Sequence, residues 1–188
     1  MSVITVATMG MLLAFAPFIA FAVTDRVVGS TPGLIAAAIV SIGLLLRDIS
    51  AGRSMKILEI GTGALFSILA VFALFMQPAW SVIGVRVIVD AGLLAIVIIS
   101  MAIRQPFTLQ YAREQTPPEI WSRPEFIRTN YVITAAWALA FTVMVAAEMV
   151  LLYIPSVPRQ VGVIAIIAAL MAAVKFTGWY PERERSAS

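Results

Sequence analysis

Long apolar runs recur along most of this chain, and they constrain its fold more than any other feature of the sequence. A helix that crosses the hydrocarbon core of a bilayer needs about 20 consecutive apolar residues, and runs near this length are separated here by shorter polar stretches. Charged residues make up 12% of the chain, against about 25% of a typical soluble domain. We therefore predict an all-α, polytopic membrane protein that folds as one helical unit.

The apolar runs predict six transmembrane helices within a single domain over residues 1–180. Their expected bounds are residues 3–23, 32–46, 57–76, 82–103, 131–154 and 158–176. Pro17 is expected to kink the first span, because proline removes a backbone donor from a helix. The second span carries small residues spaced by four, which predict a face for close helix contact: Gly29, Gly33, Ala37 and Ser41.

The only long polar passage in the chain covers residues 104–130, between the fourth and fifth predicted spans. Basic and aromatic side chains are enriched where a protein meets lipid headgroups. Two S/T-x-x-E capping boxes, which start at Thr116 and Ser122 and each carry a proline, predict a short interfacial helix and then the start of the fifth span. The arginines of the passage are candidate lipid-headgroup contacts: Arg104, Arg113, Arg123 and Arg128.

Basic residues are divided unevenly between the two sides that six spans define. All lysines and arginines except Arg26, Arg86 and Arg159 fall on the side that also holds both termini. Cytoplasmic loops carry an excess of basic residues. We therefore expect both termini, the interfacial segment 104–130 and a flexible tail over residues 181–188 to be cytoplasmic.

Three charged residues lie inside the predicted spans near their outer ends, namely Arg86, Asp90 and Glu148. Charges in a bilayer are costly and often mark function. Arg86 and Asp90 are four residues apart, so they share a helix face and can pair, while Glu148 needs a partner from another span. The cluster is interpreted either as an outward-facing polar pocket for an ion, a proton or a headgroup, or as a salt-bridged network that pins the bundle. The second interpretation is favoured, because all three charges lie near an interface.

Other charges near the spans have simpler interpretations. Asp25 lies at the outer end of the first span, and Glu59 lies one turn beyond Lys56, with which it is expected to form an interfacial ion pair. The chain has neither cysteine nor histidine, which excludes disulfides, Cys/His zinc sites and His- or Cys-ligated haem. Without a recognisable catalytic motif, we expect no enzyme activity, no metal and no cofactor. The expected partners are membrane lipids and other membrane proteins or further copies of the chain, and not nucleic acid.

The second half of the chain resembles the bacterial intracellular septation protein A family and related small inner-membrane proteins. The matching segments are Arg104-Gln-Pro-Phe, Pro118-Glu119-Ile-Trp121, Phe126-Ile-Arg128-Thr-Asn130 and Ala135-Ala-Trp137-Ala138-Leu139. The resemblance implies a bacterial inner-membrane protein linked to envelope maintenance and cell division through protein contacts, and it brings no catalytic residues with it. A structural or interaction role is therefore the leading hypothesis. The alternatives are a small transporter or channel that uses Asp90 and Glu148, and a lipid-modifying enzyme working at the 104–130 surface.

Overall fold

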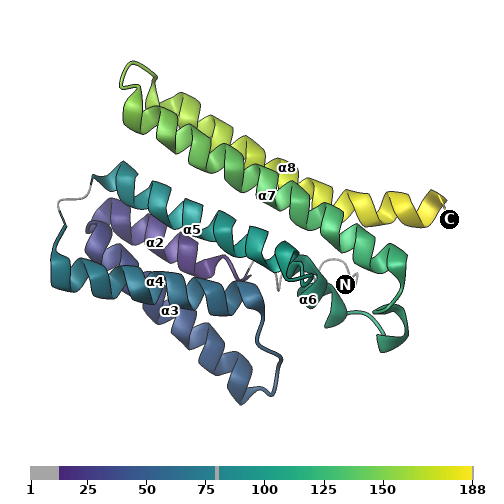
Figure 1. Cartoon of the computed structure of the whole chain (residues 1–188). Helices are drawn as coiled ribbons and strands as arrows, with labels where there is room; N and C mark the ends of the chain where they lie inside the picture. The colour runs from purple at the N-terminus through teal and green to yellow at the C-terminus, as the bar shows by residue number, and fades with distance from the viewer. Residues whose placement is uncertain (1–12, 79–80, 188) are drawn as a thin grey trace. The chain divides into compact units, whose positions relative to one another are not determined.

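A computed structural model describes residues 13–78 and 81–187 of the chain. Within these ranges the fold is all-helical, without a strand (Figure 1). Several helices are long and apolar enough to cross a membrane, which indicates a membrane protein: α3, α4, α5, α7 and α8. The elements in order are α2 (Ala16–Val27), α3 (Ser30–Ser50), α4 (Ile57–Met76), α5 (Val82–Ala102), α6 (Phe107–Arg113), the 3₁₀ turn η1 (Pro118–Ile120), α7 (Pro124–Tyr153) and α8 (Arg159–Ala187).

The first predicted span, residues 3–23, begins outside the described residues, and its crossing stays a prediction. Within the described part, Ala14 and Phe15 form a turn, and α2 begins at Ala16 with Pro17 in its first turn. Pro17 therefore begins a new helix instead of kinking a continuous one. The break lies where it does because the proline ring clashes with the carbonyl of the residue four positions earlier, here Leu13.

The helix bounds agree with the predicted spans best for α4, which covers residues 57–76 as expected. α7 begins at Pro124, several residues before its apolar part, and α8 continues through Pro181 to Ala187, where a flexible tail was predicted. Both extensions are polar. The length of an apolar run predicts the part of a helix that lipid covers. The backbone hydrogen bonds of the helix can continue beyond that run.

The described chain divides into two compact units, an N-terminal unit of residues 13–96 and a C-terminal unit of residues 97–187. In the N-terminal unit, α2 packs along α3 and α3 along α4 (Figure 1). The small-residue face predicted on α3 is confirmed in part, since Gly33, Ala37 and Ser41 are buried. The core around this face holds Phe21, Leu34, Phe66, Ala70, Val85 and Val89.

Two glycines, one on α4 and one on α5, leave room for side chains of the facing helix. A Cβ atom added to Gly61 would lie 2.8 Å from Ile96 Cγ2, and one added to Gly92 would lie 2.5 Å from Leu65 Cδ1. Each glycine therefore accommodates a large side chain of the facing helix. Small residues at helix interfaces provide the space for such contacts.

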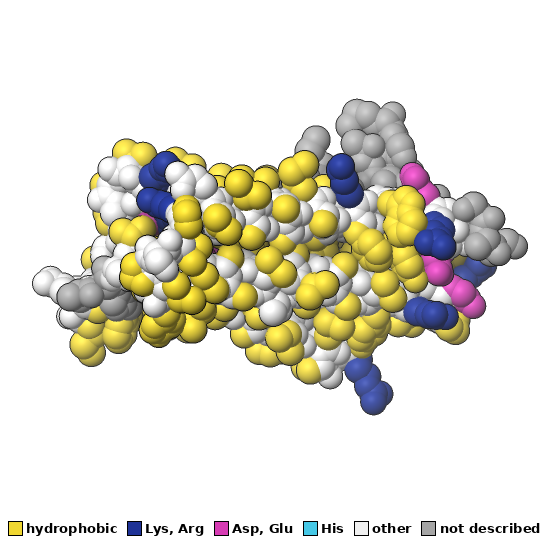
Figure 2. Space-filling view, turned by 90° about the horizontal axis from the view of Figure 1, so that it is seen from above, with side chains coloured by type: hydrophobic (Ala, Val, Ile, Leu, Met, Phe, Trp, Pro, Cys, Tyr) yellow, Lys and Arg dark blue, Asp and Glu magenta, His cyan; other side chains and the backbone are white. Residues whose placement is uncertain are grey.

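In the C-terminal unit, α7 and α8 run side by side and α6 packs on α7. Trp137 is central to it: its Nε1 donates to Thr177 Oγ1 at 2.9 Å, and its ring lies 6.4 Å from that of Phe107. Aromatic pairs at this spacing and in edge-to-face geometry are favourable. Hydrophobic side chains cover most of the face shown in Figure 2, as a surface that meets lipid requires.

The short interfacial helix predicted from Thr116 is not confirmed. The Thr116 hydroxyl donates back to Ala112 O, and its carbonyl accepts from Trp121 Nε1, each at 2.9 Å, so these residues close a turn that is followed by η1. The short α-helix of this passage is α6, seven residues long, which lies earlier and is largely buried. A capping box specifies where a helix can begin, but the residues after it must also pack.

Candidate functional site

Arg86, one of the predicted site residues, is bound to Asp25 of α2. Its Nε and Nη2 atoms donate to Asp25 Oδ2 at 3.0 and 2.6 Å, and Ser30 Oγ donates to the other carboxylate oxygen at 2.7 Å. The connection from α2 to α3 is only two residues long and includes Gly29 at φ 115°. This short turn, which favours glycine, brings Ser30 back beside Asp25.

The other two predicted residues lie on separate units. Asp90 is half-buried on α5, one turn beyond Arg86, and Glu148 is buried on α7, with 6% of its surface exposed. The predicted pocket of Arg86, Asp90 and Glu148 therefore stays a prediction. Asp25 is the partner of Arg86 that the sequence did not identify, although its place at the end of the first span was noted.

A second group of charges, which we call the ionic cluster, lies at the turn between α3 and α4. Its centre is Asp48, whose carboxylate is 2% exposed. Its Oδ1 atom accepts from Arg47 Nη2 at 2.7 Å and from Arg53 Nη2 at 3.0 Å, while Lys56 Nζ lies 3.7 Å from Oδ2. Lys56 Nζ also lies 3.4 Å from Glu59 Oε1. The predicted Lys56–Glu59 pair is confirmed, and Lys56 is buried, with 3% of its side chain exposed; its place at the membrane interface stays a prediction.

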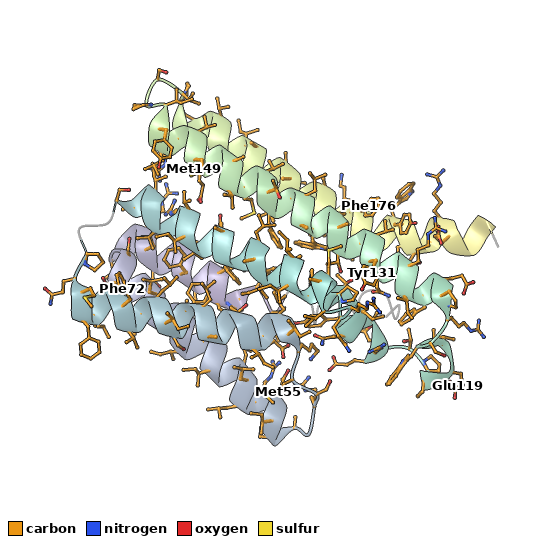
Figure 3. The ribbon with its side chains drawn as sticks, viewed as in Figure 1. Met55, Phe72, Glu119, Tyr131, Met149 and Phe176 are labelled. Carbon is orange, nitrogen blue, oxygen red and sulfur yellow. The ribbon has the colours of Figure 1, made fainter. Side chains whose placement is uncertain are left out.

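The end of α3 explains why these charges meet. Gly52 N donates to Ile49 O at 3.0 Å and Arg53 N donates to Asp48 O at 2.9 Å, with Gly52 at φ 65°. This pair of bonds is a Schellman motif, which ends a helix through one left-handed residue. It reverses the chain so that the residues after Gly52 return over Asp48; Met55, labelled in Figure 3, marks the same turn. Glu59 Oε2 then accepts from Lys56 N at 3.4 Å where α4 begins.

The cations of the ionic cluster stabilise the buried charge of Asp48. A buried carboxylate is costly unless charged donors satisfy it, and Asp48 has three cations around it. The guanidinium groups of Arg47 and Arg53 remain partly exposed, so the cluster presents positive charge outward. Such an arrangement ties the ends of α3 and α4 together and can attract anionic groups.

A small cavity, whose surface is mostly apolar, lies beside Glu59. It has a volume of about 10 Å³ and is lined by Ala14, Pro17, Ser41, Leu44, Glu59 and Thr62. The hydroxyls of Ser41 and Thr62 are buried, and neither has a hydrogen-bond partner among the groups that the structure describes. The sequence placed Ser41 on a packing face but gave no sign of this cavity.

The candidate headgroup arginines lie on α6 and on the segments before and after it in the chain. Arg104, Arg123 and Arg128 are exposed, and Arg113 lies over the ring of Trp121, with its Cζ 5.9 Å from the centroid. Arg104 has φ 60° and ends α5 through a second Schellman motif, in which Gln105 N donates to Ser100 O at 2.8 Å. Exposed guanidinium groups are able to reach phosphates, and their contact with lipid stays a prediction.

Comparison with known protein families, with curated proteins and with solved structures finds no match to this chain.

Proposed function

We propose that this chain is an integral membrane protein with a structural or interaction role, alone or as a subunit of a larger membrane assembly. One observation carries the proposal: charged side chains at both ends of the N-terminal unit form ion pairs between helices. Asp25 of α2 binds Arg86 of α5, and Asp48 of α3 pairs with Lys56 at the start of α4. Charges used in this way hold a scaffold together.

The energetics support the same role. Removing one member of a buried ion pair costs about 3–5 kcal/mol, so such pairs do not readily exchange partners during a transport cycle. A group that moves an ion or a proton must release and regain its ligand with small changes in free energy. The Asp25–Arg86 pair and the ionic cluster are better suited to fixing helix positions.

The cellular setting is part of the proposal. The resemblance of the second half to the intracellular septation protein A family supports a bacterial inner-membrane location and a link to envelope maintenance and cell division. The distribution of basic residues supports six spans with both termini cytoplasmic. Lipid headgroups would then meet Arg104, Arg113, Arg123 and Arg128, and other membrane proteins or further copies of the chain would be the partners.

Site-specific photo-crosslinking in living bacterial cells tests the proposal. A photoreactive residue is placed at Ile164 or Met171, which are exposed on α8, and at Ala173, which is buried on the same helix. We expect discrete protein adducts from at least one exposed position and fewer from the buried control. If no exposed position along the spans gives an adduct, and the protein purifies alone in mild detergent, the interaction role is wrong.

A small transporter or channel that uses Asp90 and Glu148 is the second candidate. The observation in its favour is the burial of Glu148 within α7, because an ionisable residue inside a membrane span often marks a transport pathway. The test is ion and proton flux in proteoliposomes for Asp90→Asn and Glu148→Gln, with the exposed Glu125→Gln as control. Lost flux with unchanged stability supports transport, whereas loss of the fold supports the structural role.

A further inference from the structure

The small cavity between α3 and α4 combines three features. Three of the residues that line it carry polar groups, namely Ser41, Thr62 and Glu59. It lies within a helix bundle where most neighbours are apolar. Its volume of about 10 Å³ is close to the space that the centre of one water molecule requires.

The hydroxyls of Ser41 and Thr62 differ from other buried hydroxyls of this protein. Ser100 Oγ donates to Val97 O at 2.7 Å, and Thr108 Oγ1 donates to Asn130 O at 2.9 Å. Hydroxyls in helices commonly satisfy themselves in this way, through a nearby carbonyl. Ser41 Oγ and Thr62 Oγ1 have no such bond to any group in the described part of the chain. Buried polar atoms nearly always have a partner, from the protein or from ordered water, so two such hydroxyls on residues that line one cavity indicate a shared ligand.

We propose that the cavity is a binding site for a single water molecule that bridges Ser41, Thr62 and Glu59. Water both donates and accepts, so it satisfies two hydroxyls and a carboxylate together. A monovalent cation fits less well, because Lys56 Nζ already lies 3.4 Å from Glu59 Oε1 and supplies the positive charge. The water extends the hydrogen bonds of the ionic cluster from the end of α4 into the bundle, and it joins α3 to α4 there.

The sign of one substitution tests this proposal. Thr62→Val keeps the shape of the side chain and removes only the hydroxyl. If the hydroxyl binds water, the thermal midpoint in detergent falls, by about 2–4 °C for each kcal/mol lost in a chain of this size. If the cavity is dry, the midpoint rises, because an unsatisfied buried polar group has been removed. Ser41→Ala is expected to act in the same direction as Thr62→Val.

Two controls make the result specific. Thr142→Val is the matched substitution, since the Thr142 hydroxyl is exposed on α7 and bonds to Ala138 O of its own helix; it should shift the midpoint little. Thr62→Ser keeps the hydroxyl and should retain most of the stability. A midpoint that rises in Thr62→Val contradicts the proposal.

The identity of the ligand is tested on the unmodified protein. Melting in sodium, potassium and choline chloride at equal ionic strength should give the same midpoint. If sodium alone raises the midpoint and Thr62→Val abolishes that increase, the ligand is a cation and not water. A high-resolution density map in nanodiscs should show a peak about 3 Å from both hydroxyl oxygens, and an empty cavity there would refute the proposal even if the variants failed to fold.

Discussion

Replacing Asp25 by asparagine should destabilise the N-terminal unit. The substitution keeps the size of the side chain and removes its charge. Arg86 would then keep its guanidinium group beside a neutral amide. Its side chain is 23% exposed, whereas that of Asp25 is 0% exposed, so water can reach only one member of the pair.

The magnitude follows from this difference in exposure. Leaving one member of a buried pair without its partner costs about 3–5 kcal/mol, and partial hydration of Arg86 reduces the loss for Asp25→Asn to about 2–4 kcal/mol. Each 1.4 kcal/mol is a tenfold change in an equilibrium constant, so the unfolding constant should rise by about 30-fold to several hundred-fold. Arg86→Gln should cost more, because it leaves the carboxylate without water or a cation.

The assay is reversible unfolding in mixed micelles with increasing SDS, followed by circular dichroism, for both single variants and for the double variant. The double variant should lose less than the sum of the single losses, with a coupling free energy of at least about 1.5 kcal/mol. Arg26→Gln is the control, since Arg26 is exposed beside Asp25 and should change stability by less than about 0.5 kcal/mol. Additive losses, or an Asp25→Asn variant as stable as the control, would refute the pairing as a source of stability.

Further predictions use the same unfolding assay. Gly52→Ala should destabilise by about 1 kcal/mol, because Gly52 has φ 65° and a Cβ is strained there; an unchanged midpoint would contradict the Schellman turn. Arg104→Gly should stabilise by up to about 1 kcal/mol, because Arg104 adopts φ 60° where glycine is unstrained, and a loss of stability would show that the guanidinium group is needed. Trp137→Phe should cost about 1 kcal/mol or more, through the lost bond to Thr177 and the smaller ring, whereas Trp179→Phe at an exposed position should be nearly neutral.

The charged residues show which contacts can be predicted from the sequence and which cannot. The Lys56–Glu59 pair was predictable because residues three apart on one helix are neighbours whatever else the chain does. Asp48 was assigned to a polar turn, yet it lies in the last turn of α3 and is buried. The burial of Asp48 could have been predicted, because Asp48 follows Ser41 by two helical turns and therefore lies on the same face of α3 as the small residues.

The α-helix predicted from Thr116 is not confirmed for a related reason, since only the 3₁₀ turn η1 follows that residue. The capping box at Thr116 is a local signal, and it is present in the chain. The residues of α6 are buried because they pack on α7, where Thr108 Oγ1 bonds Asn130 O and lies 2.7 Å from Thr134 Oγ1. Contacts between residues more than 20 positions apart decide that packing, and no local pattern contains them.

The sequence by itself determined the class of fold, the position of α4 and the inward face of α3. In a bilayer every backbone polar group must be satisfied within its own segment, so apolar length alone specifies a helix. Tertiary structure decided which charges on different helices meet. Arg86 binds Asp25, 61 positions earlier, because the two-residue turn between α2 and α3 and the close packing of small residues bring that carboxylate within reach.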